Sequence, residues 1–134
     1  MKYLALDYGS KKIGVAISDE MNIFAFPFTI INNKNKQEVL TKITRIVQEN
    51  NIKTIVLGES VNARGELNAI AKEAREFAFT LEEIFLKKNI DSGVHFEKEW
   101  FSTVEARRYE DRRDADDSAA AIILQRYLEK LNRK

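Results

Sequence analysis

Residues 3–19 read YLALDYGSKKIGVAISD, and this stretch decides the fold. Two short runs of apolar and β-branched residues, 3–8 and 12–18, flank a turn that contains glycine, which predicts a pair of antiparallel strands. Asp7 stands at the end of the first strand, where a buried carboxylate is costly unless it binds a metal ion or hydrogen-bond donors. Two chemistries use such an acid: metal-dependent cleavage of a phosphodiester bond, and binding of nucleotide phosphates.

The composition narrows the class of protein. A chain of 134 residues predicts one domain over residues 1–134, and a net charge of +1 means that nucleic-acid binding needs a local basic patch. The absence of cysteine excludes disulfides and thiolate zinc sites, and one histidine, His95, excludes histidine-rich metal sites. No apolar run approaches the ~20 residues of a membrane span. We therefore expect a cytoplasmic protein with no membrane partner.

The rest of the chain alternates between strand and helix patterns. The predicted strands are 23–31, 54–58 and 94–97, and the predicted helices are 39–50, 67–85, one that starts at the capping box Ser102–Glu105, and 120–131. Pro27 predicts that its strand lies at an edge of the sheet. This order predicts an α/β fold: a five-stranded mixed sheet, with an antiparallel meander of three strands plus parallel strands, flanked by helices.

Three carboxylates fall at comparable places in this layout. Asp7 ends the first strand, Glu99 lies just past the last strand, and Asp116 lies at the start of the final helix. Ligands collect at the carboxyl ends of the strands in such sheets, so we expect the three acids to converge there. Carboxylate oxygens suit Mg²⁺, and two such ions can activate water and stabilise the leaving oxygen of a phosphodiester.

Each of these acids also has a purely structural interpretation. Asp7 can cap the hairpin turn with its carboxylate, and Glu99 can be a solvated loop acid. Asp116 is favoured by the helix dipole whether or not it binds a metal ion. His95, in the middle of a predicted strand, is interpreted as structural.

Four segments together resemble one known family. They are the hairpin 6–16, the strand 55–58 with the loop 62–65, the segment 99–106, and the start of the final helix, 116–128. The combination resembles the YqgF/RuvX family of the RNase H-like nuclease superfamily. The resemblance covers most of the chain.

The resemblance implies an RNase H-like fold and a metal-dependent nuclease that uses Mg²⁺ or Mn²⁺. Carried over by position, the catalytic and metal-binding acids are Asp7, Glu99 and Asp116, with Asp117 competing for the third place. The implied substrate is nucleic acid, either pre-16S rRNA processed at its 5′ end or branched DNA cut as by a Holliday junction resolvase. The choice between RNA and DNA, and between endo and exo action, stays open.

The chain departs from the family pattern at several positions. Lys98 and Trp100 stand where the family carries an aspartate and an arginine, and Glu59-Ser60 replaces a usual Leu-Pro pair. Lys98 is expected to weaken metal binding or contact a phosphate, and Glu59 to add a charge near the substrate face. These departures support a further alternative, a catalytically weakened module that binds nucleic acid.

Basic residues near the predicted site are candidates for substrate binding. They are Lys11, Lys12, Arg64, Arg107 and Arg108, with Arg112 and Arg113 close by. Nuclease substrates demand such phosphate contacts, but acidic residues interleave with the arginines, so a solvated, ion-paired face is an equal alternative. Trp100 can stack on an unpaired base, whereas Phe101 is expected to cover the core.

A second enzyme class shares the opening motif. The spacing Asp7-x-Gly9-x-x-x-x-Gly14 resembles the phosphate loop of actin-like phosphotransferases, but those proteins enclose the nucleotide between two lobes, and this chain is about half the needed size. The oligomeric state, monomer or homodimer, stays open. A junction resolvase needs a two-fold dimer to cut symmetrically.

Overall fold

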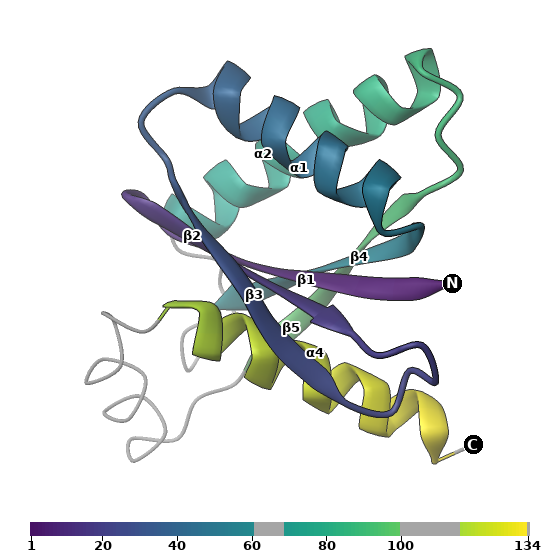
Figure 1. Cartoon of the computed structure of the whole chain (residues 1–134). Helices are drawn as coiled ribbons and strands as arrows, with labels where there is room; N and C mark the ends of the chain where they lie inside the picture. Colours follow the sequence, from purple (N-terminus) through teal and green to yellow (C-terminus); the bar gives the residue numbers. More distant parts are fainter. Residues whose placement is uncertain (61–68, 100–115, 134) are drawn as a thin grey trace.

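The computed structural model describes residues 1–60, 69–99 and 116–133, which form a five-stranded sheet and helices on both of its faces (Figure 1). The strand order across the sheet is β3-β2-β1-β4-β5. The strands are β1 (Lys2–Tyr8), β2 (Lys12–Ser18), β3 (Ala25–Asn32), β4 (Ile52–Ser60) and β5 (Gly93–Glu99). The described helices are α1 (Lys36–Glu49), α2 (Ala69–Lys87) and α4 (Asp116–Asn132).

The directions of the strands confirm the predicted mixed sheet. β1, β2 and β3 form the antiparallel meander, and β4 and β5 run parallel to β1. β3 is an edge strand, as Pro27 predicts, because a proline has no N–H to donate to a further strand.

Alternation along β1 separates two hydrophobic cores. Leu4, Leu6 and Tyr8 are buried in the core that α1 and α2 cover, and Phe85 of α2 is also buried there. Ala5 belongs to a second core with residues of α4. Figure 1 shows α4 on the face of the sheet opposite to α1 and α2. Side chains two residues apart share one face of a sheet, so Asp7 belongs to the face that α4 covers.

Small residues let α4 lie close to its face of the sheet. Ala5, Ala16 and Ala120 are fully buried between the sheet and the helix. At Gly58 of β4, a Cβ atom would lie 2.6 Å from Cδ1 of Ile123, which is closer than two carbons approach. The absence of a side chain at Gly58 therefore leaves room for the side chain of Ile123 against β4.

Asparagines mark both ends of α1. The side chain of Asn35 accepts a hydrogen bond from the backbone N–H of Glu38 at 3.1 Å, which satisfies a donor of the first turn. At the other end, the N–H of Asn50 donates to the carbonyl of Ile46, and Asn51 adopts a positive φ of 53° that turns the chain into β4. The helix thus returns the chain to a strand beside β1.

Some predicted boundaries need correction. β3 begins at Ala25 rather than at residue 23, because the carboxylate of Asp19 accepts hydrogen bonds from the N–H groups of Ile23 and Phe24 and holds them in a turn. β4 runs from Ile52 to Ser60 and is longer than the predicted strand 54–58. Glu99 is the last residue of β5 rather than a loop residue past it. The helix predicted from Ser102 lies outside the described residues.

No helix in the described part of the chain is long and apolar enough to cross a bilayer.

Candidate active site

Asp7 lies in β1, one residue before the end of the strand. It is half-buried, and it pairs in register with Gly14 of β2. The turn after it is closed by a hydrogen bond of 3.0 Å from the N–H of Gly9 to the carbonyl of Lys12. A Cβ at Gly9 would lie 2.6 Å from that carbonyl oxygen, so a glycine is needed for this tight turn. The backbone therefore fixes where Asp7 is presented.

Glu99 is the last residue of β5, and the face of its position follows from the pairing of β4 with β5. Where β4 pairs with β5, Gly58 lies opposite Glu97 and Ser60 lies opposite Glu99. Glu97 forms an ion pair with Lys130 of α4, which places Glu97 on the face that α4 covers. Alternation assigns position 99 to that face as well, about 7 Å further toward the carboxyl end of the strand.

Asp116 is the first residue of α4, and the direction of α4 brings this end toward Asp7. The other end of the helix lies beside the start of β1, where the rings of Tyr127 and Tyr3 are 5.7 Å apart. Ile123 lies against Gly58 of β4. Asp116 precedes Ile123 by two helical turns, about 10 Å, toward the carboxyl ends of β1 and β4 (Figure 1).

The backbone thus directs the three predicted acids to one corner of one face of the sheet. Asp7 and Glu99 come from the carboxyl ends of parallel strands, and Asp116 comes from the first turn of the covering helix. Asp117 lies in the same turn as Asp116. Carboxylate oxygens are the ligands that suit a hard cation, so these three positions stay the predicted metal site.

The prediction for Glu59 is wrong. Its side chain is 1% exposed and belongs to the opposite face of the sheet, where Arg75 of α2 contacts it with an Nε–Oε2 distance of 2.5 Å. The guanidinium of Arg75 also lies 5.3 Å from the centre of the Phe96 ring. The hydrogen bond to Glu59 raises the pKa of Arg75. Glu59 is therefore a buried structural acid and adds no charge to the face of Asp7.

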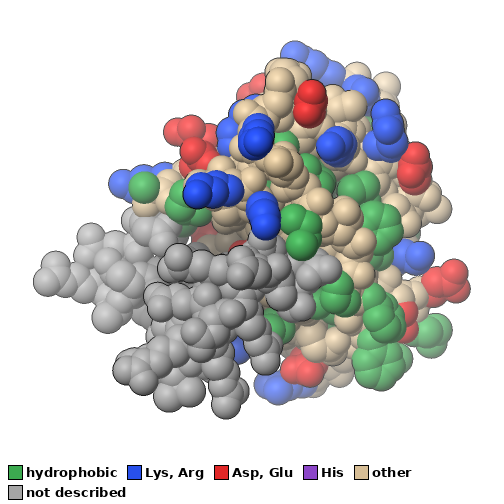
Figure 2. Space-filling model, turned by 60° about the vertical axis from the view of Figure 1, so that its left-hand side comes forward, with side chains coloured by type: hydrophobic (Ala, Val, Ile, Leu, Met, Phe, Trp, Pro, Cys, Tyr) green, Lys and Arg blue, Asp and Glu red, His purple; other side chains and the backbone are tan. Residues whose placement is uncertain are grey.

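Two of the five predicted substrate-binding residues can be placed. Lys11 and Lys12 are exposed at the end of the β1–β2 turn and the start of β2, four and five residues after Asp7. Figure 2 shows lysines and arginines gathered on the upper part of the surface in view. The other three lie outside the described residues: Arg64, Arg107 and Arg108.

Lys36 is a basic residue near the hairpin that the sequence analysis did not identify. It begins α1, and its Nζ donates hydrogen bonds to the hydroxyl of Tyr8 and, at 3.1 Å, to Oδ1 of Asn33. The Nδ2 of Asn33 donates in turn to the carbonyl of Gly9 at 2.9 Å. Through Asn33, Lys36 is thus linked by hydrogen bonds to the turn that follows Asp7. Only the fold brings it there, because 28 residues separate it from Tyr8.

A family model described as "RuvX: Holliday junction resolvase" matches residues 1–130. The chain belongs to the RuvX family. Its fold is accordingly the RuvC-like form of the RNase H fold, as the resemblance in the sequence implied.

Bacterial relatives of this RuvX-family chain carry the name "Putative pre-16S rRNA nuclease". The protein of Fusobacterium nucleatum is 38% identical, and the alignment covers 96% of each chain. The protein of Pelagibacter ubique is 35% identical, over 98% of this chain and 90% of the relative. The protein of Clostridium beijerinckii is 32% identical over the full length of both.

Solved structures of junction resolvases share the fold. RuvC of Thermus thermophilus, solved with a Holliday junction substrate, superposes with a TM-score of 0.59 at 12% identity, over 96% of this chain and 93% of that one. The Holliday junction resolvase of fowlpox virus gives a TM-score of 0.57 at 17% identity, over 97% and 99% of the two chains. At these identities the likeness establishes the fold of the RuvX-family chain.

The donor set at the corner of Asp7 fits a hard divalent cation. The three acids offer carboxylate oxygens, which Mg²⁺ and Mn²⁺ prefer, and the chain contains no thiolate to favour a softer metal. Among side chains that the structure describes, no group of three His, Asp or Glu residues could hold a metal ion. That search includes the side chain of Asp7 but not those of Glu99 and Asp116, which lie outside the described side chains.

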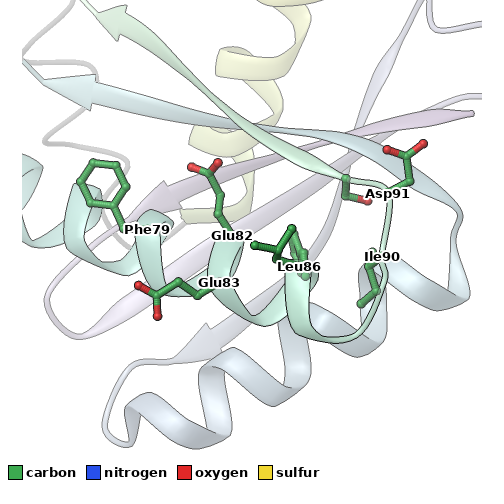
Figure 3. Close-up of a pocket in the computed structure, with 8 residues that line it drawn as sticks. Phe79, Glu82, Glu83, Leu86, Ile90 and Asp91 are labelled. Atoms are coloured by element: carbon green, nitrogen blue, oxygen red, sulfur yellow. The ribbon is translucent and has the colours of Figure 1, made fainter.

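A groove on α2 lies at the other end of the sheet. Its volume is ≈ 600 Å³, and its lining includes Phe79, Leu86, Glu82, Glu83 and Asp91 (Figure 3). It adjoins the start of β5, whereas Glu99 is at the end of that strand, about 20 Å away. The acidic lining and this separation set the groove apart from the candidate active site.

Proposed function

We propose that this chain is a metal-dependent nuclease that hydrolyses phosphodiester bonds, with the 5′ end of pre-16S rRNA as its substrate in the cytoplasm. The observation that carries the proposal is the placement of Asp7, Glu99 and Asp116 at one corner of the face that α4 covers. The names of its relatives, at 30–38% identity, support the choice of substrate.

In this proposal Asp7, Glu99 and Asp116 hold Mg²⁺ or Mn²⁺. Such an ion would lower the pKa of a bound water and neutralise charge on the phosphate. The protein itself positions the metal-binding carboxylates and balances their charge. Asp7 is held by the Gly9 turn, and the N-terminal end of the α4 dipole favours negative charge beside Asp116.

The basic residues complete the proposed site. Lys11 and Lys12 are exposed between β1 and β2, and we assign them, with Arg64, Arg107 and Arg108, to the phosphates on either side of the cleaved bond. Phosphate contacts fix the register of a nucleic acid without reading its sequence. Cleavage at a defined end would then depend on the shape of the substrate.

The test is cleavage of a labelled pre-rRNA leader with Mg²⁺, with Mn²⁺ and with chelator. Asp7→Asn, Glu99→Gln and Asp116→Asn are each expected to lower the rate at least 100-fold, because each removes a charged oxygen ligand. Asp117→Asn, measured beside Asp116→Asn, decides which of the two is the third acid. Asp91→Asn, at an exposed acid at the far end of the sheet, controls for net charge. Cleavage of normal rate by Asp7→Asn would refute the assignment of the site.

A Holliday junction resolvase is the second candidate, and the description of the matching family model favours it. A four-way DNA junction in the same assay separates the two activities: cutting of the RNA alone supports the first proposal, and cutting of the junction alone supports the second. Binding of either substrate without any cutting would instead identify a catalytically weakened module. The departures Lys98 and Trp100 would then be the first positions to revert.

A further inference from the structure

Exposed apolar side chains concentrate along the edge strand β3 and the loop before it. Of the eleven large hydrophobic side chains that are exposed among the described residues, six lie between positions 21 and 30. We call this set the β3 apolar edge: Met21, Ile23, Phe24, Phe26, Phe28 and Ile30. In Figure 2 hydrophobic side chains gather on the right-hand flank of the molecule, the side to which β3 turns in that view.

The area of this surface is that of an interaction site. Phe24, Phe26 and Phe28 are 57%, 55% and 49% exposed. Because an aromatic side chain has about 200 Å² to bury, the three rings alone expose about 300 Å². Patches larger than a few hundred Å² mark contact surfaces in soluble proteins. With its aliphatic members, the edge supplies a third or more of the about 800 Å² that each partner buries in a standard interface.

The chemistry of the edge suits a second copy of the same chain. Residues 21–33 contain no charged side chain, although 32% of the whole sequence is charged. No cation on the strand can therefore contact a phosphate backbone. A surface without charge can also meet itself without repulsion, which is the requirement of a two-fold interface.

The charges at the two ends of β3 favour an antiparallel arrangement of the copies. Asp19 and Glu20 precede the strand, whereas Lys34 follows it and Lys12 pairs in register with Asn32 at the same end. A two-fold axis through the middle of the strand brings the acidic end of one copy against the basic end of the other. Complementary charge at the rim fixes the register of such a contact.

We propose that two copies of this chain associate through the β3 apolar edge about a two-fold axis, with their β3 strands antiparallel. Side chains carry the contact, because Pro27 has no N–H to donate and the register with β2 shifts at Val15/Ala16. Asp7 pairs with Gly14 and Gly14 with Ile30, so Asp7 lies two strands, about 10 Å, from the interface. The association does not depend on the proposed nuclease activity.

The first test is sedimentation equilibrium of the whole chain over a wide range of concentration. The unmodified protein is expected to form dimers, and Phe26→Glu/Phe28→Glu to raise the dissociation constant at least 100-fold, because two charges would be buried at the centre. Phe79→Glu is the matched control, since this residue of α2 is 58% exposed and lies on another surface. Thermal unfolding of each variant, with Phe26→Ser/Phe28→Ser as a milder change, separates dissociation from misfolding.

The second test uses the absence of cysteine in the chain. Phe28→Cys, near the middle of β3, is expected to form a disulfide-linked dimer on mild oxidation, whereas Phe79→Cys is not. A monomeric unmodified protein, or equal cross-linking of both variants, would overturn the proposal. If the protein is monomeric and Phe26→Glu/Phe28→Glu instead loses affinity for a labelled single-stranded RNA, the edge is a base-stacking surface and the dimer is refuted.

Discussion

Replacing Arg75 by methionine tests the assignment of Glu59 as a buried structural acid. The carboxylate of Glu59 is 1% exposed, and it accepts hydrogen bonds from Nε of Arg75 at 2.5 Å and from Nη2 at 3.3 Å. Removing the guanidinium leaves that carboxylate buried without its ion-pair partner, which costs about 3–5 kcal/mol in other buried pairs. Arg75 itself is 42% exposed, so water can reach the vacated space. We therefore expect the lower value, about 3 kcal/mol.

The opposite truncation is expected to cost much less. Glu59→Leu removes the buried charge and leaves the half-exposed Arg75 in water, so the loss should stay within about 1 kcal/mol. The double variant Glu59→Leu/Arg75→Met should resemble Glu59→Leu, since no buried charge remains in either. For a chain of this length, about 3 kcal/mol lowers the midpoint of thermal unfolding by about 10 °C.

Urea and thermal unfolding of the four proteins provide the assay. The signature is asymmetry: Arg75→Met is strongly destabilised, and Glu59→Leu restores most of the loss when added to it. Equal losses for the two single variants would refute the burial argument. Because Glu59 lies on the face away from Asp7, Glu59→Leu should also cleave the pre-rRNA leader at the normal rate.

Gly58→Val should lower the free energy of unfolding by about 1–3 kcal/mol in urea, because its side chain would collide with α4. A hydrogen bond from the N–H of Phe24 lowers the pKa of Asp19 below its usual value of 3.8. The stabilisation by the Asp19 carboxylate should therefore be present above pH 3.8 and disappear as the pH falls through the lowered pKa. The difference in unfolding free energy between the unmodified protein and Asp19→Asn, followed from pH 6 to pH 2, measures this loss. Burial opposes the charge of Lys36, yet its hydrogen bond to Tyr8 leaves the pKa above 10.5. Lys36→Met should therefore lose stability below pH 10.5, with a difference that shrinks as the pH rises further.

Local patterns predicted the elements of the sheet because each strand carries its own evidence. The hairpin from residue 3 to residue 19 alternates apolar side chains between two faces, and both faces are covered in the structure. Pro27 predicted an edge strand because proline has no backbone N–H to donate to a neighbouring strand. Properties of this kind do not depend on distant residues, so a single sequence can reveal them.

The misjudged features depend on partners far along the chain. Glu59 was expected at the substrate face because the resemblance placed it in the family's central loop, just after the predicted strand 54–58. Alternation from Leu57, which is buried against α1 and α2, could have placed it on the other face, but the sequence does not reveal that Arg75 would contact it there. Lys36 illustrates the same limit, since its hydroxyl partner Tyr8 is adjacent only after folding.

The two faces of the sheet divide stability from proposed chemistry, and this division bears on the departure at position 98. On one face, large residues such as Leu6 and Phe85 fill the core. On the other, alanines and Gly58 bring the first turn of α4 toward Asp7. The register pairs Lys98 with Glu59, so alternation assigns position 98 to the first face and position 99 to the second. Replacing the family's aspartate at position 98 by lysine therefore leaves the acid at position 99 on the face of Asp7. We expect Lys98→Asp to change stability more than the rate of cleavage, whereas Glu99→Gln should do the reverse; a large gain in cleavage rate for Lys98→Asp would contradict this division.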